Sequence, residues 1–303
     1  MTESIKKYFK VGIVQFMAYP TALRGEDPNI LENVKKIARD DYFDAIELTW
    51  IKDYGARTKV ASALTTAHME VCYGAQPRLL TTGLNPNHLD EAERQKAEAT
   101  LVEAIDEAHQ LGSKGISFLS GKWEAATREQ SYAQLLKTTR ALCDYAKTKD
   151  MIVELEVFDY DIAKAALIGP APLAARFAAE MRTSHSNFGL LIDLSHIPMT
   201  YETPEFVIRT LRPYITHFHI GNTVCHNPAA PGYGDEHQRF GFSGGASDVP
   251  QVLEFLRVLQ QEGFFNTENP YVLSFEVKPW QDECPELTIV NAKRVLNRAW
   301  ALL

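Results

Sequence analysis

Acidic and histidine side chains fall near the ends of apolar, β-rich runs in the C-terminal half of the chain. These runs are MIVELEVF (151–158), FGLLIDLS (188–195), ITHFHIGN (215–222) and YVLSFEVK (271–278). A buried carboxylate is costly unless it is paired or binds a metal. Each run contributes one candidate near its end: three are the carboxylates Glu156, Asp193 and Glu276, and the fourth is the imidazole of His219. Crowded carboxylates repel one another, so a shared cation is the simplest way to keep three of them buried together.

The donor set indicates the kind of ion. One imidazole nitrogen and several carboxylate oxygens favour Mn²⁺, Mg²⁺ or Co²⁺ over an ion that prefers sulfur. A single acid at a strand end is more often ion-paired, and a lone strand histidine is usually a satisfied core residue. The prediction of one divalent metal ion therefore depends on all four residues occurring together.

Three further polar residues share strand faces with the four, one layer lower, because side chains alternate along a strand. They are Glu154, His217 and Ser274. We expect them to form a hydrogen-bonded polar layer that orients the metal ligands.

The strands that carry these residues belong to a longer pattern. Four earlier apolar runs are KVGIVQF (centred on 11–16), FDAIELTW (43–50), MEVCYG (69–74) and KGISFLSG (114–121). Segments with helical spacing lie between the runs or after the last one, at 29–40, 91–112, 132–150, 172–184, 249–263 and 286–303. Eight alternations of strand and helix imply βαβ units with parallel strands.

Eight such units in 303 residues predict an α/β fold with a single (β/α)₈ TIM barrel domain over residues 1–303. The alternative is an open doubly wound sheet, which ordinarily shows a glycine-rich first turn, and QFMAYP has none. In a barrel, the four candidate ligands would stand at one level near the carboxyl ends of the strands, where active sites lie. A long loop, 223–248, follows the seventh strand.

Composition excludes several classes of partner. The net charge is −8 and the isoelectric point is near 5.6, so we expect no electrostatic binding to nucleic acid or to anionic membranes. Four cysteines without CxxC spacing predict no disulfide framework and a reducing, cytoplasmic location. We expect no transmembrane helix, and we interpret the first apolar run, interrupted by Gln15, as a strand and not a signal peptide.

The motifs LEVFD, LIDLSH, HFHIGN and SFEVKP resemble those of the xylose-isomerase-like TIM barrels. This superfamily includes ketose 3-epimerases, sugar-phosphate isomerases and endonuclease IV. The resemblance covers the whole chain in architecture, while its specific motifs lie in the C-terminal half. It implies that the same four residues are metal ligands and that His196, three residues after Asp193, binds substrate.

The chain departs from the ketose epimerases at two places. They carry another glutamate six residues after the strand-5 ligand, where this chain has Ile162, and a short GEANR-like segment where this chain has GNTVCHNPAAPGYGDEHQRFG. These differences argue against a simple free ketose as substrate. FMAYP and YGDEHQRFG more loosely resemble the large subunits of C-glycoside deglycosidases and the epimerases of 3-keto-glycosides. The family implies a homo-oligomer, and this branch adds a small accessory subunit as a possible partner.

The reactions of these families begin with removal of a proton from a carbon next to a carbonyl. A metal ion stabilises the resulting enediolate, and acids or bases on opposite sides move the proton. We therefore predict a metal-dependent carbohydrate isomerase or epimerase with Glu156 and Glu276 as the proton-transfer pair. The alternative is a lyase that eliminates an aglycone from a 3-keto-glycoside. More remote alternatives are a non-catalytic sugar-binding barrel and a trinuclear zinc phosphodiesterase, which needs histidines that strands 2 to 4 lack.

Other residues near strand ends are weaker candidates for substrate binding. Lys122 and Trp123 follow strand 4, and an aromatic ring there either stacks on a sugar or belongs to the core. His237 and Arg239 lie with Asp235 on the long loop, which either closes over the substrate or forms a subunit contact. The remaining candidates, which end strands 2 and 8, are Glu47, Trp50 and Lys278. Lys278 either pairs with Glu276, holds substrate or is exposed.

Overall fold

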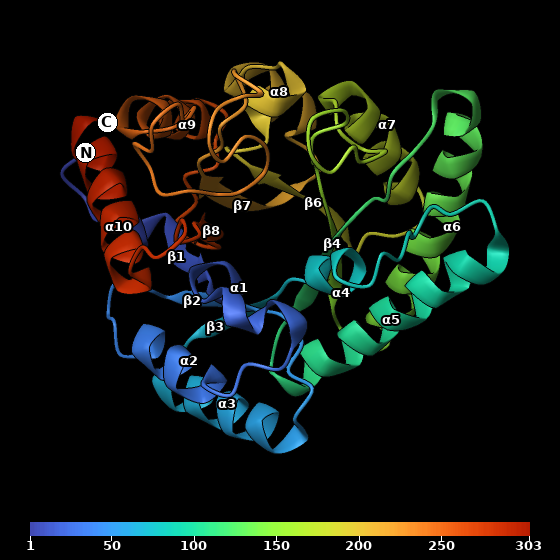
Figure 1. Ribbon diagram of the computed structural model, residues 1–303, viewed down its shortest axis with the longest axis horizontal. Coiled ribbons are helices and arrows are strands. Elements are labelled where there is room, and N and C mark those ends of the chain that lie inside the picture. Colours follow the sequence, from blue (N-terminus) through green and yellow to red (C-terminus); the bar gives the residue numbers. More distant parts are fainter.

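The computed structural model describes all 303 residues, and a ring of eight parallel strands lies at its centre (Figure 1). The strands are β1 (Phe9–Val14), β2 (Ala45–Leu48), β3 (Glu70–Tyr73), β4 (Gly115–Leu119), β5 (Ile152–Glu156), β6 (Phe188–Asp193), β7 (Ile215–Gly221) and β8 (Tyr271–Glu276). Their order in the sheet is β3-β2-β1-β8-β7-β6-β5-β4. The first and last strands are therefore direct neighbours, as closure into a barrel requires.

The barrel is nearly closed between β3 and β4. These two strands form no ladder, but Gly74 and Ser117 make a parallel bridge just beyond β3. The backbone N–H of Ala75 also donates a hydrogen bond to the carbonyl oxygen of Ser117, at 2.7 Å. The predicted TIM barrel is confirmed, and the open doubly wound sheet is excluded because the helices lie around the outside of one ring (Figure 1).

The longer helices are α2 (Ile30–Ala38), α3 (Tyr54–Ala67), α5 (Glu91–Gln110), α6 (Arg128–Lys147), α7 (Ala171–Arg182), α8 (Pro204–Leu211), α9 (Val249–Gln261) and α10 (Pro285–Leu302). Two short helices, α1 (Gln15–Ala18) and α4 (Gln76–Leu80), follow β1 and β3 directly. Side chains that cap the N-terminus fix where several of these helices begin. Asp90, for example, accepts from the backbone N–H groups of Ala92 and Glu93 before α5. None of the helices combines the length and the apolar character that crossing a bilayer requires.

All eight predicted strands are present, but most are shorter than their apolar runs. The clearest difference is at β1, which ends at Val14, whereas the predicted strand continued to residue 16. Gln15 and Phe16 instead begin α1, whose C-terminal cap forms when Tyr19 N–H donates to the Gln15 carbonyl. The chain turns at this point because it has reached the rim of the barrel. An apolar pattern in the sequence does not reveal where that rim lies.

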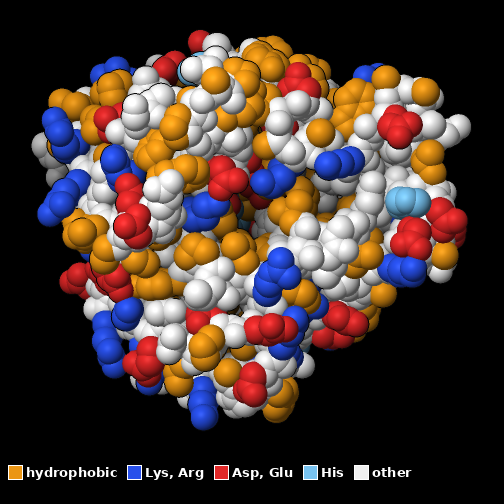
Figure 2. Space-filling view, viewed as in Figure 1, with side chains coloured by type: hydrophobic (Ala, Val, Ile, Leu, Met, Phe, Trp, Pro, Cys, Tyr) orange, Lys and Arg blue, Asp and Glu red, His pale blue; other side chains and the backbone are white.

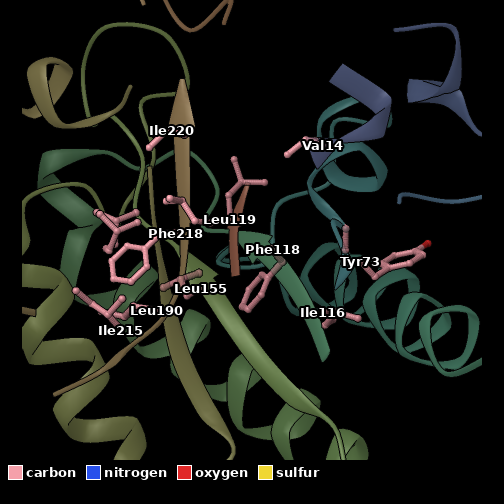
Figure 3. Close-up of a cluster of buried hydrophobic side chains, with 14 of the residues drawn as sticks. Val14, Tyr73, Ile116, Phe118, Leu119, Leu155, Leu190, Ile215, Phe218 and Ile220 are labelled. Atoms are coloured by element: carbon pink, nitrogen blue, oxygen red, sulfur yellow. The ribbon is translucent and has the colours of Figure 1, made fainter. Parts of the chain in front are cut away.

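Alternation along the strands separates an apolar outer face from a polar inner one. On β7, Phe218 and Ile220 point into the buried layer between barrel and helices (Figure 3). The Phe218 ring packs edge-on against Phe255 of α9. The intervening residues of β7, His217 and His219, therefore face the barrel axis. The hydrophobic effect thus fixes which side chains enter the barrel interior.

Candidate active site at the carboxyl ends of the strands

The four predicted ligands converge at one end of the barrel. Glu156, Asp193 and Glu276 end β5, β6 and β8, and His219 lies near the end of β7. Their donor atoms all lie within 4.8 Å of one another, and each of the four residues is at least nine-tenths buried. Nδ1 of His219 is 2.7 Å from Glu276 Oε2 and 3.8 Å from Glu156 Oε1.

The strand register refines the expectation that these residues stand at one level. Asp193 is paired with His219, but His219 is paired with Ser274, so Glu276 lies two residues further along β8. Glu156 is paired with Leu191, two residues before Asp193. Barrel strands are tilted and staggered, so side chains from successive register positions reach the same point on the axis.

These residues fit a divalent cation. Oε1 of Glu156 is buried and has no hydrogen-bond partner, although Oε2 accepts from the amide nitrogen of Gln76 at 2.6 Å. A buried carboxylate oxygen without a donor is a position that a cation would satisfy. Burial, and then the nearby charge of Glu276, raise the pKa of Glu156 to about 8. Without an ion, the group therefore holds a proton at neutral pH.

A second cluster lies beside the first. Asp235, on the loop after β7, accepts through Oδ1 from Nε2 of His237 at 2.8 Å and from Nε2 of His196 at 3.2 Å. Its other oxygen is 2.9 Å from Nζ of Lys164. Burial alone would lower the pKa values of both histidines, but Asp235 raises that of His196 to about 10 and that of His237 to about 9. The cluster thus attaches the long loop to the end of β6.

Donor atoms of Asp193, His196 and His237 also lie within 4.8 Å of one another. His237 adopts a left-handed backbone conformation, with φ of 49°, which is uncommon for a residue with a side chain. Gly221 leaves space for it, because a Cβ at that glycine would lie 3.2 Å from His237 Nδ1 and 2.7 Å from the Glu276 carbonyl oxygen. The close approach of β7, β8 and the loop therefore depends on a glycine.

A cavity of about 380 Å³ opens onto Glu156, His219 and Glu276, while Asp193 is buried and does not line it. Its polar lining includes His237 and Lys278, as expected, together with Gln76, Lys164 and Arg24. Its apolar wall includes Phe16, Met17, Leu23, Leu80 and Phe158. Figure 2 shows basic and acidic side chains together near the middle of this face of the molecule. His196 is buried behind the lining and contacts the cavity only through its neighbours.

Glu47 and Asp235 also line this cavity, but the remaining weaker candidates, Arg239, Lys122, Trp123 and Trp50, do not. Arg239 instead pairs with Glu283, with Nε 2.9 Å from Oε1. Lys122 is exposed and lines an adjoining cavity, while Trp123 is half-buried against the core. Trp50 donates through its indole nitrogen to the carbonyl oxygen of Leu23 at 2.8 Å and lines a separate depression.

Several cavity residues lie outside the sequence predictions, and two polar ones, Gln76 and Lys164, contact Glu156 and Asp235. Gln76 begins α4, directly after β3, and Lys164 lies on the loop between β5 and α7. The position of Gln76 just after a strand was the available signal, because that is where barrel active sites gather. The sequence around Lys164 contains no comparable signal, because Lys164 meets Asp235 only after two separate loops have folded together.

The polar layer below the four residues is largely hydrogen-bonded. Nδ1 of His217 is 3.3 Å from Glu154 Oε2, and Thr216 donates to Glu154 Oε1 at 2.6 Å. Nε2 of His217 is 3.0 Å from Oε1 of Glu47, at the inner face of β2. Ser274 Oγ is buried without a partner.

With this geometry established, comparisons with known proteins place the chain. The model of the family described as xylose isomerase-like TIM barrel matches residues 34–286. The chain belongs to this family. No curated protein matches it by sequence. This xylose isomerase-like barrel is similar to solved structures at low identity, which supports the fold alone.

One such structure is a D-tagatose 3-epimerase-like protein, with a TM-score of 0.73, 18% identity, and coverage of 96% of this chain and 98% of that one. A second is 3-keto-D-glucoside 4-epimerase from E. coli, with a TM-score of 0.67, 15% identity, and coverage of 95% and 99%. A third is a family 2 AP endonuclease from Brucella melitensis, with a TM-score of 0.67, 16% identity, and coverage of 93% and 96%.

Proposed function

We propose that this protein is a divalent-metal-dependent carbohydrate isomerase or epimerase. The observation that carries the proposal is the convergence of three buried carboxylates and one imidazole around the unpartnered Oε1 of Glu156. Glu156, Asp193, His219 and Glu276 would hold one Mn²⁺, Mg²⁺ or Co²⁺ ion. The sugar epimerases among the similar structures support the same class of reaction.

The bound cation would supply Lewis-acid polarisation of a substrate carbonyl, which makes the neighbouring C–H bond more acidic. The two glutamates then divide the proton transfers. Burial alone would raise the pKa of Glu276, but His237 and His219 lower it to about 2, whereas that of Glu156 is raised to about 8. These pKa values describe the metal-free protein. In the metal-bound protein we assign the two proton-transfer roles from position, because Glu156 and Glu276 end different strands, β5 and β8, and reach the proposed ion from different sides.

In the proposed reaction, Glu276 removes the proton from the carbon next to the carbonyl. The electrons of that C–H bond form a carbon–carbon double bond, and the carbonyl π electrons move to oxygen. Glu156 then donates a proton to the opposite face of the same carbon, which collapses the double bond and gives the epimer. Return of the proton to the neighbouring carbon, with transfer of a hydroxyl proton, gives the isomer. Each glutamate exchanges its proton with solvent or its partner before the next turnover.

The cavity lining suits a sugar. Lys278 and Lys164 supply cationic donors for hydroxyl or carbonyl oxygens, and His237 lies beside Glu276, with Nε2 3.5 Å from Oε1. Phe16 and Met17 present apolar surface that can pack on the C–H face of a sugar ring. Asp235 would keep His196 and His237 in place through the hydrogen bonds described above.

A lyase acting on a 3-keto-glycoside is the second candidate, and one observation favours it. A further cavity of about 520 Å³ adjoins the first and shares Leu80 and Lys164 with it. Its apolar lining includes Leu79, Leu84 and Leu119. A free ketose leaves this space unused, whereas the aglycone of a glycoside would enter it. If the aglycone is attached β to the carbonyl, the same proton removal expels it.

The first test is the metal content of protein purified without a metal-affinity tag, compared with Asp193→Ala. We expect about one Mn, Co or Mg ion per chain in the parent protein and none in the variant. Two or three zinc ions would favour the phosphodiesterase alternative. No bound metal after dialysis against Mn²⁺ would refute the metal-dependent function.

The second test is exchange of a substrate hydrogen with D₂O in a panel of keto-sugars and 3-keto-glycosides. We expect deuterium at the carbon next to the carbonyl, and loss of this exchange in Glu276→Gln. Glu70→Gln is the matched control, because Glu70 lies on β3 and pairs with Lys10 away from the cavity. Undiminished exchange in Glu276→Gln would refute its role as the base.

A further inference from the structure

Glu47 is the acidic side chain that β2 directs into the barrel, and it lies directly behind the proposed metal ligand His219. Its Oε1 atom is 2.9 Å from Nε2 of His219 and 3.0 Å from Nε2 of His217. The residue is 1% exposed. It therefore accepts hydrogen bonds from two imidazoles on the same strand and faces no bulk solvent.

The two ring nitrogens of His219 face carboxylates on opposite sides of the ring. Nε2 faces Glu47, while Nδ1 faces Glu276 Oε2 at 2.7 Å and Glu156 Oε1 at 3.8 Å. A neutral imidazole has one donor nitrogen and one acceptor nitrogen. In the metal-free protein both nitrogens of His219 face carboxylates, so each donates a proton. When a cation takes the place of the Nδ1 proton, donation from Nε2–H to Glu47 leaves the Nδ1 lone pair directed at the point where the acids converge. A hydrogen bond made by the far nitrogen is what selects the metal-binding nitrogen of a histidine.

Glu47 is itself fixed by the layer beneath. His217 reaches it through Nε2 and reaches Glu154 through Nδ1, at 3.0 and 3.3 Å. Thr216 donates to the other oxygen of Glu154 at 2.6 Å. A continuous set of hydrogen bonds thus runs from Glu154 through His217 and Glu47 to His219, across β5, β7 and β2.

We propose that Glu47 is a positioning residue, which sets the ring orientation and the tautomer of His219 and strengthens Nδ1 as a metal ligand. The proposal rests on the proposed metal-dependent function. Glu47 also lines the cavity assigned to the substrate, and the role proposed for it is exerted through its hydrogen bond to His219. Because Glu47 is anionic, it also makes the imidazole a better electron donor than a neutral acceptor would.

The test compares Mn²⁺ binding to the full-length protein and its variants after metal removal with EDTA. The free Mn²⁺ signal in electron paramagnetic resonance gives the dissociation constant. Glu47→Gln keeps the shape and one acceptor oxygen but removes the charge, so we expect Mn²⁺ to bind about 10- to 100-fold more weakly. Glu70→Gln, a glutamate on the neighbouring strand β3, is the matched control and should bind like the parent.

A second readout separates positioning from folding. Co²⁺ added to the metal-free protein gives visible d–d absorption bands that depend on the ligands. We expect these bands to shift in Glu47→Gln and to remain unchanged in Glu70→Gln, while near-ultraviolet circular dichroism of the metal-free proteins stays the same. If Glu47→Gln does not fold, Glu47→Asp serves instead, since it withdraws the carboxylate from both imidazoles and should weaken Mn²⁺ binding similarly.

His217→Gln gives the deciding comparison, because an amide N–H can still donate to Glu47. We expect less than a fivefold loss of Mn²⁺ affinity in this variant. An equal loss in His217→Gln and Glu47→Gln would overturn the proposal and assign the effect to packing of the whole layer. Parent-like affinity in Glu47→Gln would also overturn it. Failure of the parent protein to bind Mn²⁺ would instead refute the metal-dependent function.

Discussion

The metal-free protein should lose stability as the pH rises above neutrality. His196, His217 and His237 have folded-state pKa values raised to about 10, 9 and 9, because carboxylates surround them in the buried site. An unfolded histidine titrates near pH 6.5. Between about pH 6.5 and 9, the folded protein therefore binds more protons than the unfolded chain. The stability that these protons contribute is complete below pH 6.5 and is lost as the pH rises through the folded-state values.

The magnitude follows from the number of extra protons. Each extra proton held by the folded state changes the free energy of unfolding by about 1.4 kcal/mol per pH unit. The three histidines share neighbouring carboxylates, so we count one net proton and not three. From pH 7 to pH 9, the loss is then about 3 kcal/mol. For a chain of 303 residues, this corresponds to a decrease of about 5 °C in Tm.

Calorimetry on EDTA-treated protein at pH 7, 8 and 9 measures this decrease in Tm directly. Mn²⁺ at 100 times its dissociation constant should raise the free energy of unfolding by about 3 kcal/mol, because an ion that binds only the folded state stabilises that state. Asp193→Asn should not respond to Mn²⁺. Asp235→Asn should show a flatter pH dependence, since it removes the carboxylate that holds two of the histidines protonated. A constant or rising Tm between pH 7 and 9 in the metal-free parent would refute the reasoning.

Three further predictions concern geometry. Gly221→Ala should weaken Mn²⁺ binding at least tenfold by titration calorimetry, because a Cβ would lie 2.7 Å from the carbonyl oxygen of Glu276; unchanged affinity would show that the strands can separate without cost. Leu80→Arg, at the junction of the two cavities, should lower kcat/KM for a 3-keto-glycoside and spare a free ketose, and an equal decrease for both would contradict the two-cavity assignment. Arg94→Met should lower the midpoint of urea unfolding, because the 2%-exposed guanidinium loses its bidentate pair with Glu91 and its hydrogen bond to Thr138, while Glu91 keeps Lys137 as a partner; an unchanged midpoint would exclude a structural role.

The barrel and the four converging residues were predictable because both follow from local periodicity. Strand alternation places His219 on the opposite face from Phe218, and burial of the apolar face then directs the histidine inward. The same rule directs Glu156 and Glu276 into the barrel. Parallel strands also end at the same rim, so residues separated by more than 100 positions in the sequence meet there.

The remaining features of the site depend on how loops fold onto one another. The sequence places Arg239 two residues after His237, yet only the histidine reaches the cavity, because His237 takes a left-handed conformation and Arg239 turns to Glu283. Lys164 reaches Asp235 from another loop, and no local pattern encodes that meeting. Gln15 belongs to an apolar run, but the end of the strand is set by the barrel rim.

The missing ladder between β3 and β4 has a consequence for how the chain could be reconnected. The sheet has its two edges there, in the middle of the sequence, while the two chain termini lie together and the amino group of Met1 contacts the carbonyl oxygen of Trp300 at 3.1 Å (Figure 1). A circular permutant that joins the termini and opens the chain between α4 and α5 would begin near one edge strand and end at the other. Its new ends would interrupt no strand pairing, so the order of the chain would follow the order of the sheet.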